Sequence, residues 1–500
     1  MNLARAFALS VEKQPQKIAL YYGESEITFA ALAKQAAAVT EELRRNGVKP
    51  GDRVGLWLKN RPEFIAAVFG IFGVGAVLVP INNFLKPAEV SYILNDAGID
   101  VLVTEEELAV HAPALFVERA ALKILKVENM AAFTAGNTVD LKAGLAAFQS
   151  LAREEKDLAV IIYTSGTTGR PKGAMLSHGN LLHNVESCRI VLETVDQDRM
   201  AVLLPLFHSY MLTVGVLLPL IVGGTIVLVK SLGQPRQMIQ EMFVRSATIV
   251  PAIPPFYRAL VASPLLSKVP FRICISGSAP LPVQTLKEFE SKFGIPLIEG
   301  YGLSEASPVV AKNPLRGDHK AGSIGLPIAN VEMSIQDDTG KILGTSEIGE
   351  ICVRGGNVML GYWNQPAETA KVMRGDWLLT GDVGYRDADG YYYITDRKKD
   401  MLLVNGNNVY PREIEEVIYQ FPSVKEVAVV GAPDVRKGEQ PVAFVVANDG
   451  VVIDEKLLLQ FVRSKLADYK MPREVVFLSA LPRNATQKIL KTELRKMLTK

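Results

Sequence analysis

The residues with the clearest chemical potential form one short run, YTSGTTGRPKG, between Tyr163 and Gly173. Its glycines leave backbone N–H groups unshielded, its hydroxyl side chains add neutral donors, and Lys172 adds a positive charge. Together these groups can wrap a triphosphate. A Gly- and Thr-rich surface turn is the alternative interpretation, but few turns need so many donors in so few residues. We therefore expect nucleotide phosphates to bind to Thr164, Ser165, Gly166, Thr167, Thr168, Gly169 and Lys172.

The run differs from a Walker A loop, because no serine or threonine follows Lys172 to bind Mg²⁺. The metal ion must therefore be bound from elsewhere. The block EGYGLSE, from Glu299 to Glu305, follows a strand-like run and supplies a carboxylate that can hold Mg²⁺ against phosphate oxygens. Taken alone, the block is equally typical of an ordinary Gly-Tyr-Gly turn.

Two further short motifs carry groups suited to a nucleotide. Asp382 closes the motif LTGD, and the pair Asp396-Arg397 follows the strand-like run YYYIT. A carboxylate can accept hydrogen bonds from both ribose hydroxyls, and a guanidinium can bridge ribose and phosphate. As isolated motifs they are more typical of a surface turn and of an ion pair at a strand end.

The elements that position these residues alternate between strands and helices in the first half of the chain. RVGLWL is followed by the helical pattern PEFIAAVFGIFGVG and by AVLVPIN, and TIVPAIPP, FRICISGSAP, a helix from Leu281 to Phe293 and IPLIEGYG continue the alternation. This rhythm predicts parallel sheets covered by helices on both faces. The fold class is therefore α/β, with stacked αβα layers in a large N-terminal domain.

The pattern changes after about residue 320 and again after Lys399. Short strands separated by Gly and Asp turns first predict a small antiparallel β unit. Helices and strands then alternate in a small α+β unit that ends in a basic helix. We predict the boundary in the charged run DRKKD, which gives an N-terminal domain over 1–398 and a C-terminal domain over 399–500.

The bulk composition excludes several classes of function. The formal net charge of +2 over 500 residues is too small to favour nucleic-acid binding. From Arg397 onward, 18 Lys and Arg stand against 13 Asp and Glu, a balance that suits a phosphate-bearing partner or a solvated surface. Cys188, Cys274 and Cys352 are too few and too scattered for a disulfide framework, which favours a reducing compartment.

The sequence also bears on location. The N-terminus lacks the uninterrupted apolar core of a signal peptide. The most apolar stretch, from Val214 to Val229, contains Pro219 and Gly223-Gly224, and therefore predicts a buried helix, a turn and a buried strand instead of a membrane span. We expect a cytoplasmic protein without a transmembrane segment; a peripheral membrane contact stays open, as does the choice between monomer and homodimer.

These motifs, in this order, resemble those of the adenylate-forming superfamily, most of all bacterial long-chain-fatty-acid–CoA ligases. The resemblance covers essentially the whole chain. It implies that Tyr301 stacks on adenine, that Ser304 approaches the α-phosphate, and that Glu305 and Thr164 position Mg²⁺. It also identifies the segment SGSAPLP, from Ser276 to Pro282, with the stretch beside adenine. The implied nucleotide contacts beyond the phosphate loop are Ser278, Ala279, Pro280, Gly300, Tyr301, Gly302, Ser304, Asp382, Ile394 and Arg397.

The resemblance extends to the C-terminal domain. The segment LPRNATQKILK places Lys488 at the position of the family's catalytic lysine, although Gln487 stands where the family commonly has Gly. Lys399 takes the position of a hinge, about which the domain rotates between two half-reactions. The loop Asn405, Gly406 and Asn407 is then offered to the pantetheine arm of coenzyme A. The implied catalytic residues are Lys488, Glu305, Lys172 and Arg397.

The implied activity is the ATP-dependent activation of a small-molecule carboxylic acid as its acyl-adenylate, followed by transfer of the acyl group to coenzyme A. Family placement assigns the acyl pocket to His208, Tyr210, Met211, Val214, Gly277 and Gly300. The apolar residues among them favour a medium- or long-chain fatty acid, with an aryl acid as the alternative. Two other functions remain open: an adenylation enzyme that loads a carrier protein, and a non-catalytic nucleotide sensor.

Overall fold

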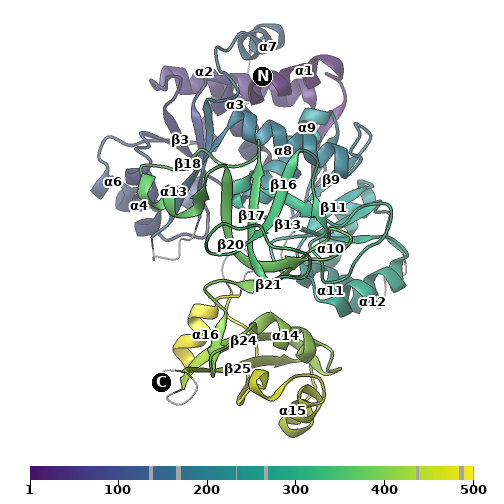
Figure 1. Cartoon of the computed structure of the whole chain (residues 1–500). Coiled ribbons are helices and arrows are strands. Elements are labelled where there is room, and N and C mark those ends of the chain that lie inside the picture. Colours follow the sequence, from purple (N-terminus) through teal and green to yellow (C-terminus); the bar gives the residue numbers. More distant parts are fainter. Residues whose placement is uncertain are drawn as a thin grey trace.

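The computed structural model describes residues 1–133, 139–164, 170–231, 234–263, 268–434, 438–483 and 489–498. Figure 1 shows a large body of sheets and helices with a smaller unit beneath it, which contains the C-terminus. The chain passes from one to the other after strand β21 (Tyr392–Arg397). The α/β prediction, with a large N-terminal and a smaller C-terminal part, is confirmed.

The first sheet of the large body contains nine strands among the described residues. Its six central strands are parallel, and its edge strands are antiparallel. The order is β15 (Leu326–Pro327), β14 (Val309–Lys312), β13 (Leu297–Gly302), β12 (Ile273–Ser276), β11 (Ile249–Ala252), β9 (Arg199–Val202), β10 (Thr225–Leu228), β1 (Ile18–Tyr22) and β2 (Ser25–Thr28).

The second sheet contains seven strands in the described part of the chain. It is parallel from β7 to β6 and antiparallel at its other edge. The order is β18 (Gly361–Tyr362), β8 (Lys172–Ser177), β7 (Leu158–Thr164), β4 (Val77–Pro80), β3 (Arg53–Trp57), β5 (Val101–Thr104) and β6 (Lys123–Lys126). Strand β8 is not among the strands predicted from the sequence.

Two smaller antiparallel sheets follow. The third, predicted from the Gly and Asp turns, consists of β16 (Val331–Gln336), β17 (Gly349–Gly355), β20 (Trp377–Arg386), β19 (Met373–Arg374) and, beside β20, β21. The sheet of the C-terminal unit consists of β23 (Asn407–Val409), β22 (Leu402–Val404), β25 (Gly438–Ala447) and β24 (Val424–Asp434), with β26 (Glu474–Phe477) parallel to β25.

Helices cover these sheets (Figure 1). Those of the large body are α1 (Leu3–Lys13), α2 (Phe29–Arg45), α3 (Pro62–Gly73), α4 (Pro87–Asp96), α5 (Glu106–Ala109), α6 (Ala112–Glu118), α7 (Leu141–Gln149), α8 (His178–Val191), α9 (Leu218–Val222), α10 (Pro235–Val244), α11 (Pro254–Ala262), α12 (Val283–Phe293) and α13 (Pro366–Val372). Those of the C-terminal unit are α14 (Pro411–Tyr419), α15 (Glu455–Arg463) and α16 (Lys491–Met497). Short 3₁₀ turns occur at η1 (Val127–Asn129), η2 (Ala131–Phe133), η4 (Ser304–Ala306) and η5 (Asp468–Lys470).

Helix α8 begins directly after β8 because its first turn is capped from both sides. The Asn180 N–H donates to Ser177 Oγ at 3.0 Å, and the Ser177 N–H donates to Asn180 Oδ1 at 2.8 Å. This reciprocal pair satisfies two backbone donors that the helix itself leaves unbonded. It fixes α8, whose other end supplies Cys188 and Leu192 to the cavity described below.

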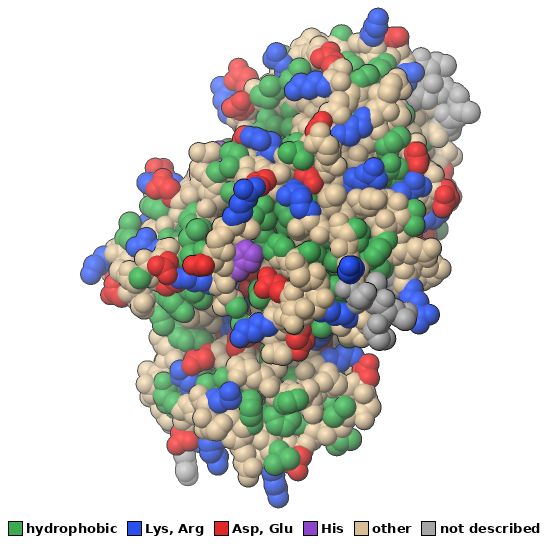
Figure 2. Space-filling view, turned by 90° about the vertical axis from the view of Figure 1, so that its right-hand side faces the viewer, with side chains coloured by type: hydrophobic (Ala, Val, Ile, Leu, Met, Phe, Trp, Pro, Cys, Tyr) green, Lys and Arg blue, Asp and Glu red, His purple; other side chains and the backbone are tan. Residues whose placement is uncertain are grey.

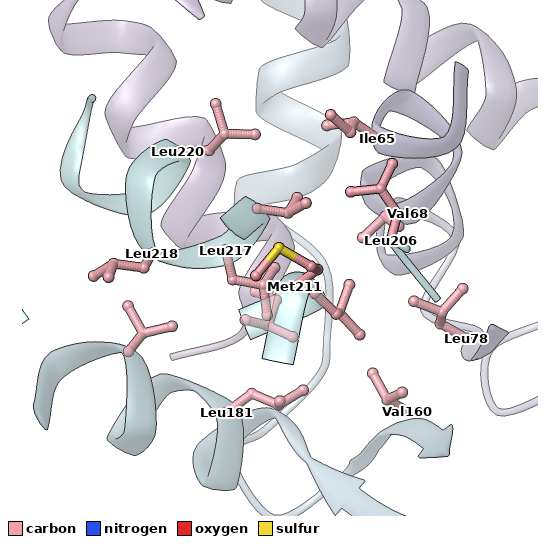
Figure 3. Packing of buried hydrophobic residues seen from close by; sticks show 14 of the residues in the cluster. Ile65, Val68, Leu78, Val160, Leu181, Leu206, Met211, Leu217, Leu218 and Leu220 are labelled. Atoms are coloured by element: carbon pink, nitrogen blue, oxygen red, sulfur yellow. The ribbon is translucent and has the colours of Figure 1, made fainter. Parts of the chain in front are cut away.

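The apolar stretch around Val214 is a buried helix, as predicted, followed by Gly223 at a positive φ of 92° and the buried strand β10. Its first part, η3 (Met211–Leu217), is wound as a π-helix, which the sequence did not predict. Met211 is fully buried here, and Figure 3 shows its side chain near Leu217, Leu181 and Leu206. Among the described residues, no helix is long and apolar enough to cross a membrane.

On the face drawn in Figure 2, the charged side chains of the described residues form no large patch of one sign. Lys and Arg side chains are interspersed there with Asp and Glu side chains over both the large body and the smaller unit. Several cations of the C-terminal unit are paired, including Lys470 with Glu413 at 2.6 Å and Lys425 with Asp449 at 2.7 Å.

Candidate active site

The hydroxyl-rich run lies where β7 turns back into β8. Thr164 and Lys172 are opposite each other in this antiparallel pair and form the base of a hairpin. Ser165, Gly166, Thr167, Thr168 and Gly169 lie outside the described residues. The Lys172 side chain is buried, forms an ion pair with Glu368 of α13, and has its Nζ 5.2 Å from the centre of the Tyr362 ring.

This ion pair bears on the expected role of Lys172. Because the ammonium already contacts a carboxylate, it holds α13 against the base of the hairpin. A direct contact between Lys172 and a phosphate stays a prediction, and it requires the pair with Glu368 to loosen.

Glu305 lies in the turn η4, close to the same hairpin. Its Oε1 accepts a hydrogen bond from the Tyr362 hydroxyl at 2.9 Å and lies 3.5 Å from Thr164 Oγ1. The structure thus brings together the two residues expected to position Mg²⁺. One carboxylate, a hydroxyl and substrate phosphates form a ligand set that fits this ion. In the described part of the chain, no cluster of three or more His, Cys, Asp or Glu side chains forms a metal site by itself.

A second cluster joins three predicted nucleotide residues. The Tyr301 hydroxyl donates to Asp382 Oδ2 at 2.6 Å, and Arg397 Nε lies 2.7 Å from Asp382 Oδ1. Asp382 and Arg397 are directly opposite on β20 and β21, which explains their contact. Burial, with Asp382 adding to it, raises the pKa of Tyr301 well above its ordinary value, so the hydroxyl remains a donor. The Arg397 side chain is half exposed and can reach a ligand.

One cavity is lined both by Tyr301 of this cluster and by residues of the expected acyl pocket. The nucleotide residues that line it are Ser278, Gly300, Tyr301, Gly302 and Ser304. The acyl-pocket residues that line it are His208, Tyr210, Val214, Gly277 and, again, Gly300. Residues from distant parts of the sequence therefore meet at the carboxyl ends of β12 and β13, where parallel sheets commonly bind ligands.

The fine geometry of this cavity depends on small residues and short polar contacts. A Cβ added to Gly277 would lie 3.2 Å from the Tyr210 ring, so this glycine leaves room beside the tyrosine. His208 Nδ1 accepts a hydrogen bond from the Tyr210 N–H at 3.2 Å, which leaves Nε2 as the ring nitrogen that carries hydrogen in a neutral imidazole. Ser304 Oγ lies 2.9 Å from Ser209 Oγ.

Four residues expected in the site are not among the described residues that line the cavity. Met211 packs in the hydrophobic core instead of lining the cavity (Figure 3). Ala279 and Pro280 follow β12 and Ser278 but are not among the described lining residues. Ile394, on β21, is partly buried and packs against the same core.

Several lining residues were missed by the sequence analysis, among them Cys188, Leu192, Ile275, Val309 and Lys312. Cys188 lies in the last turn of α8, Leu192 is the residue directly after that helix, and Lys312 is the last residue of β14. No local motif marks them. Only Lys312 has a sequence signal, which is its place at the end of an otherwise apolar run, VVAK.

The C-terminal unit contacts the large body close to these residues. Arg412 of α14 lies 3.8 Å from Glu299 of β13, and its N–H donates to Asp396 Oδ2 at 3.0 Å. Lys488 lies outside the described residues, but Arg483 and Ile489 on either side form an antiparallel bridge.

The segment that follows Lys488 is anchored near the same place. Lys491 pairs with Glu415 at 2.9 Å and lies close enough to the buried Asp396 for its charge to act on the pKa of that carboxyl. Because Asp396 directly precedes Arg397, the residues after Lys488 lie next to the nucleotide cluster.

The expected hinge and coenzyme A loop are both exposed. Lys399 lies in the turn between β21 and β22. Asn405 and Gly406 form the tight turn between β22 and β23, with positive φ values of 51° and 78°, as Asn-Gly hairpin turns require. The hinge at Lys399, the domain boundary there and the contact with coenzyme A remain predictions.

Comparison with known proteins covers almost the whole chain. The family model for AMP-binding enzymes matches residues 7–363, and the model for the AMP-binding enzyme C-terminal domain matches residues 413–488. The chain is 35% identical over 525 residues to a long-chain-fatty-acid–CoA ligase of Bacillus subtilis, covering 97% of this chain and 92% of that protein. It is 36% identical over 487 residues to a feruloyl-CoA synthase of Amycolatopsis, covering 96% of each.

Solved structures show the same fold. ATP-bound MatB from Rhodopseudomonas palustris superposes with a TM-score of 0.90 at 33% identity, covering 99% of each chain. The apo structure of that protein gives a TM-score of 0.79 at the same identity and coverage. The overall arrangement of this chain is therefore nearer to the ATP-bound form than to the apo form.

Proposed function

The chain belongs to the AMP-binding, adenylate-forming enzyme family and is an AMP-forming acid–thiol ligase, and on this premise we propose that it joins a medium- or long-chain fatty acid to coenzyme A. The observation that carries the proposal is a cavity lined both by residues predicted to bind the nucleotide and by mainly apolar residues. Such a cavity suits an apolar acyl group bonded directly to AMP.

In the first step, a carboxylate oxygen of the acid attacks the α-phosphorus of ATP and pyrophosphate leaves. We assign Asp382 and Arg397 to the ribose and phosphate, and the hydrogen-bonded Ser304 to the α-phosphate. Catalysis here consists mainly of alignment and of neutralising the charge that builds up between two anions. We assign Lys488 to this neutralisation; the anchoring of Lys491 beside Asp396 supports its approach from the C-terminal unit.

We also propose that Glu305 and Thr164 hold Mg²⁺ together with the phosphates of ATP. The ion, when bound, withdraws charge from the phosphate oxygens. Tyr362 donates to Glu305 and so orients the carboxylate toward the hairpin. A requirement for Mg²⁺ in the assay below would support this assignment, and full activity in the presence of a strong chelator would refute it.

In the second step, the thiol of coenzyme A attacks the acyl carbon and AMP leaves with the bridging oxygen. We propose that rotation about Lys399 replaces the Lys488 segment by the Asn405–Asn407 turn between the two steps. A hinge of this kind lets one domain serve two reactions in turn. The exposed turn at Lys399 is compatible with such a rotation.

An aryl acid is the second candidate substrate. The relative named feruloyl-CoA synthase matches as well as the fatty-acid–CoA ligase. Tyr210, Leu192 and Lys312 also line the cavity, and the acyl group would share that cavity with the nucleotide, which favours a compact acyl group.

The test is acid-dependent exchange between ATP and labelled pyrophosphate, with straight-chain, aryl and amino acids as substrates. Each reaction is repeated with coenzyme A and analysed by mass spectrometry for the thioester, with Lys488→Ala as the inactive control. Exchange and thioester formation with fatty acids support the proposal. A clear preference for aryl acids would show that the substrate is an aryl acid instead of a fatty acid. Exchange without thioester points to a carrier protein as acceptor. ATP binding without exchange for any acid contradicts the proposal and favours a nucleotide sensor.

A further inference from the structure

The cavity contains a buried cation that the proposed function does not use. Lys312 is only 5% exposed, and it is the one Lys, Arg, Asp or Glu among the described residues that line the cavity. Apolar binding of a plain acyl group gives no reason for an ammonium at this position.

The direction of the side chain follows from the strand pairing. Lys312 on β14 is directly opposite Gly300 on β13, and a Cβ added to Gly300 would lie 3.9 Å from Lys312 Cβ. Opposite residues of an antiparallel pair leave the sheet on the same face. Lys312 therefore leaves the sheet on the face of Gly300, itself a lining residue. Its ammonium is close enough to Cys188, on the facing wall, for each group to affect the pKa of the other.

The ammonium has spare hydrogen-bonding capacity. Its Nζ donates to the Asn313 carbonyl at 3.0 Å, and among the described residues no carboxylate lies within ion-pair distance. A lysine ammonium carries three donors, and burying a charge without full compensation is costly. Burial lowers the pKa of Lys312 to about 8, against the opposing effects of Cys188 and Glu193, so the charged form still predominates at pH 7. A ligand oxygen would compensate this charge.

We propose that Lys312 determines substrate specificity by donating a hydrogen bond to an oxygen at the end of the acid opposite its reacting carboxylate. This inference rests on the proposed function and narrows its substrate class. The preferred acids carry a distal hydroxyl or carboxylate oxygen, either at the end of an aliphatic chain or on an aromatic ring. An acid without that oxygen binds at the same place but leaves the ammonium uncompensated.

The experiment compares matched pairs of acids in the pyrophosphate-exchange assay. Decanoate is paired with decanedioate, and cinnamate with 4-hydroxycinnamate, which separates an aliphatic from an aromatic source of the oxygen. Because a hydrogen bond to a charged group contributes a free energy equivalent to about tenfold or more in kcat/KM, the wild-type enzyme should prefer the oxygen-bearing member of at least one pair by that factor.

Three variants test whether Lys312 causes the preference. Lys312→Met keeps the length of the side chain and removes the cation, so it should abolish the preference while leaving kcat/KM for the plain member within about threefold. Lys312→Arg retains a cation and should retain part of the preference. Cys188→Ala alters the facing wall without altering the charge and should keep the preference.

The outcomes separate this inference from the proposed function. If plain and oxygenated members react equally in the wild type, or if Lys312→Met retains the preference, the role of Lys312 is refuted while the ligase activity stands. If no acid in any pair supports exchange, the proposed function itself fails. The wild-type comparison decides the matter even if Lys312→Met does not fold.

Discussion

Replacing Glu299 by Gln should remove a specific part of the pH dependence of stability. Glu299 is 3% exposed on β13. Its Oε1 accepts from the Leu281 N–H at 3.1 Å, and Oε2 has no hydrogen-bond partner among the described residues. Burial raises the pKa of Glu299 from 4.5 to about 7, although Arg412 opposes the change. The folded protein therefore holds a proton that the unfolded chain releases.

The sign and the size follow from this difference. A group with a raised pKa contributes stability that is fully present below pH 4.5 and is lost as the pH rises to about 7. At about 1.4 kcal/mol per pKa unit, the loss is about 3 kcal/mol. Gln keeps the acceptor for Leu281 but cannot ionise. The NH₂ group of this Gln would take the place of Oε2, where no hydrogen-bond partner is available, and this lowers the stability by about 1 kcal/mol. Glu299→Gln should then be slightly less stable than the wild type at pH 5 and about 2 kcal/mol more stable at pH 8.

Urea unfolding at pH 5 and pH 8, followed by tryptophan fluorescence, measures both values. Glu288→Gln is the matched control, because Glu288 lies exposed on the neighbouring helix α12 and should leave the pH dependence unchanged. If wild type and Glu299→Gln lose stability in parallel between these two pH values, the buried carboxyl is not the cause and the reasoning is wrong.

Three further predictions follow from the same contacts. Asp382→Asn weakens the acceptor for Arg397 and the proposed acceptor for the ribose, and should raise KM for ATP about tenfold or more while changing KM for the acid little. An equal rise of KM for both substrates would contradict this prediction. Gly277→Val fills the space beside Tyr210 and should raise KM for bulky acids far more than for acetate. An equal rise of KM for all acids would contradict the place of Gly277 in the wall of the acyl pocket. Burial lowers the pKa of His178 to about 4, so about 3 kcal/mol of stability that is present above pH 6.5 is lost as the pH falls toward 4. In urea unfolding, His178→Gln should reduce this loss of stability at acid pH. An unchanged loss would refute the assignment to His178.

The sequence predicted the parts of this site that depend on local patterns. The alternation of apolar runs and helices indicated the parallel sheets, and Gly and Asp turns indicated the small antiparallel unit. Tyr301, Asp382 and Arg397 were singled out by short motifs, and the structure brings all three together. Their contact depends on the pairing of β20 with β21, which is close in sequence.

The features that were missed depend on long-range contacts. Lys172 was assigned to phosphate as the cation of the hydroxyl-rich run, and that role stays a prediction; its ion pair with Glu368, 196 residues away, has no local sequence signal. Met211 follows His208 and Tyr210 closely, yet the π-helical winding directs it into the core. Lys312 became a candidate only when the pairing of β14 with β13 placed it opposite Gly300.

The most direct test of the account is the fate of the acid's oxygen atoms in a complete reaction. An acid labelled with ¹⁸O in its carboxylate is incubated with ATP and coenzyme A, and the products are analysed by mass spectrometry. Because the acid oxygen bridges carbon and phosphorus in the acyl-adenylate, the account predicts AMP that carries one labelled oxygen. Unlabelled AMP, or label in phosphate or pyrophosphate, would contradict the formation of an acyl-adenylate.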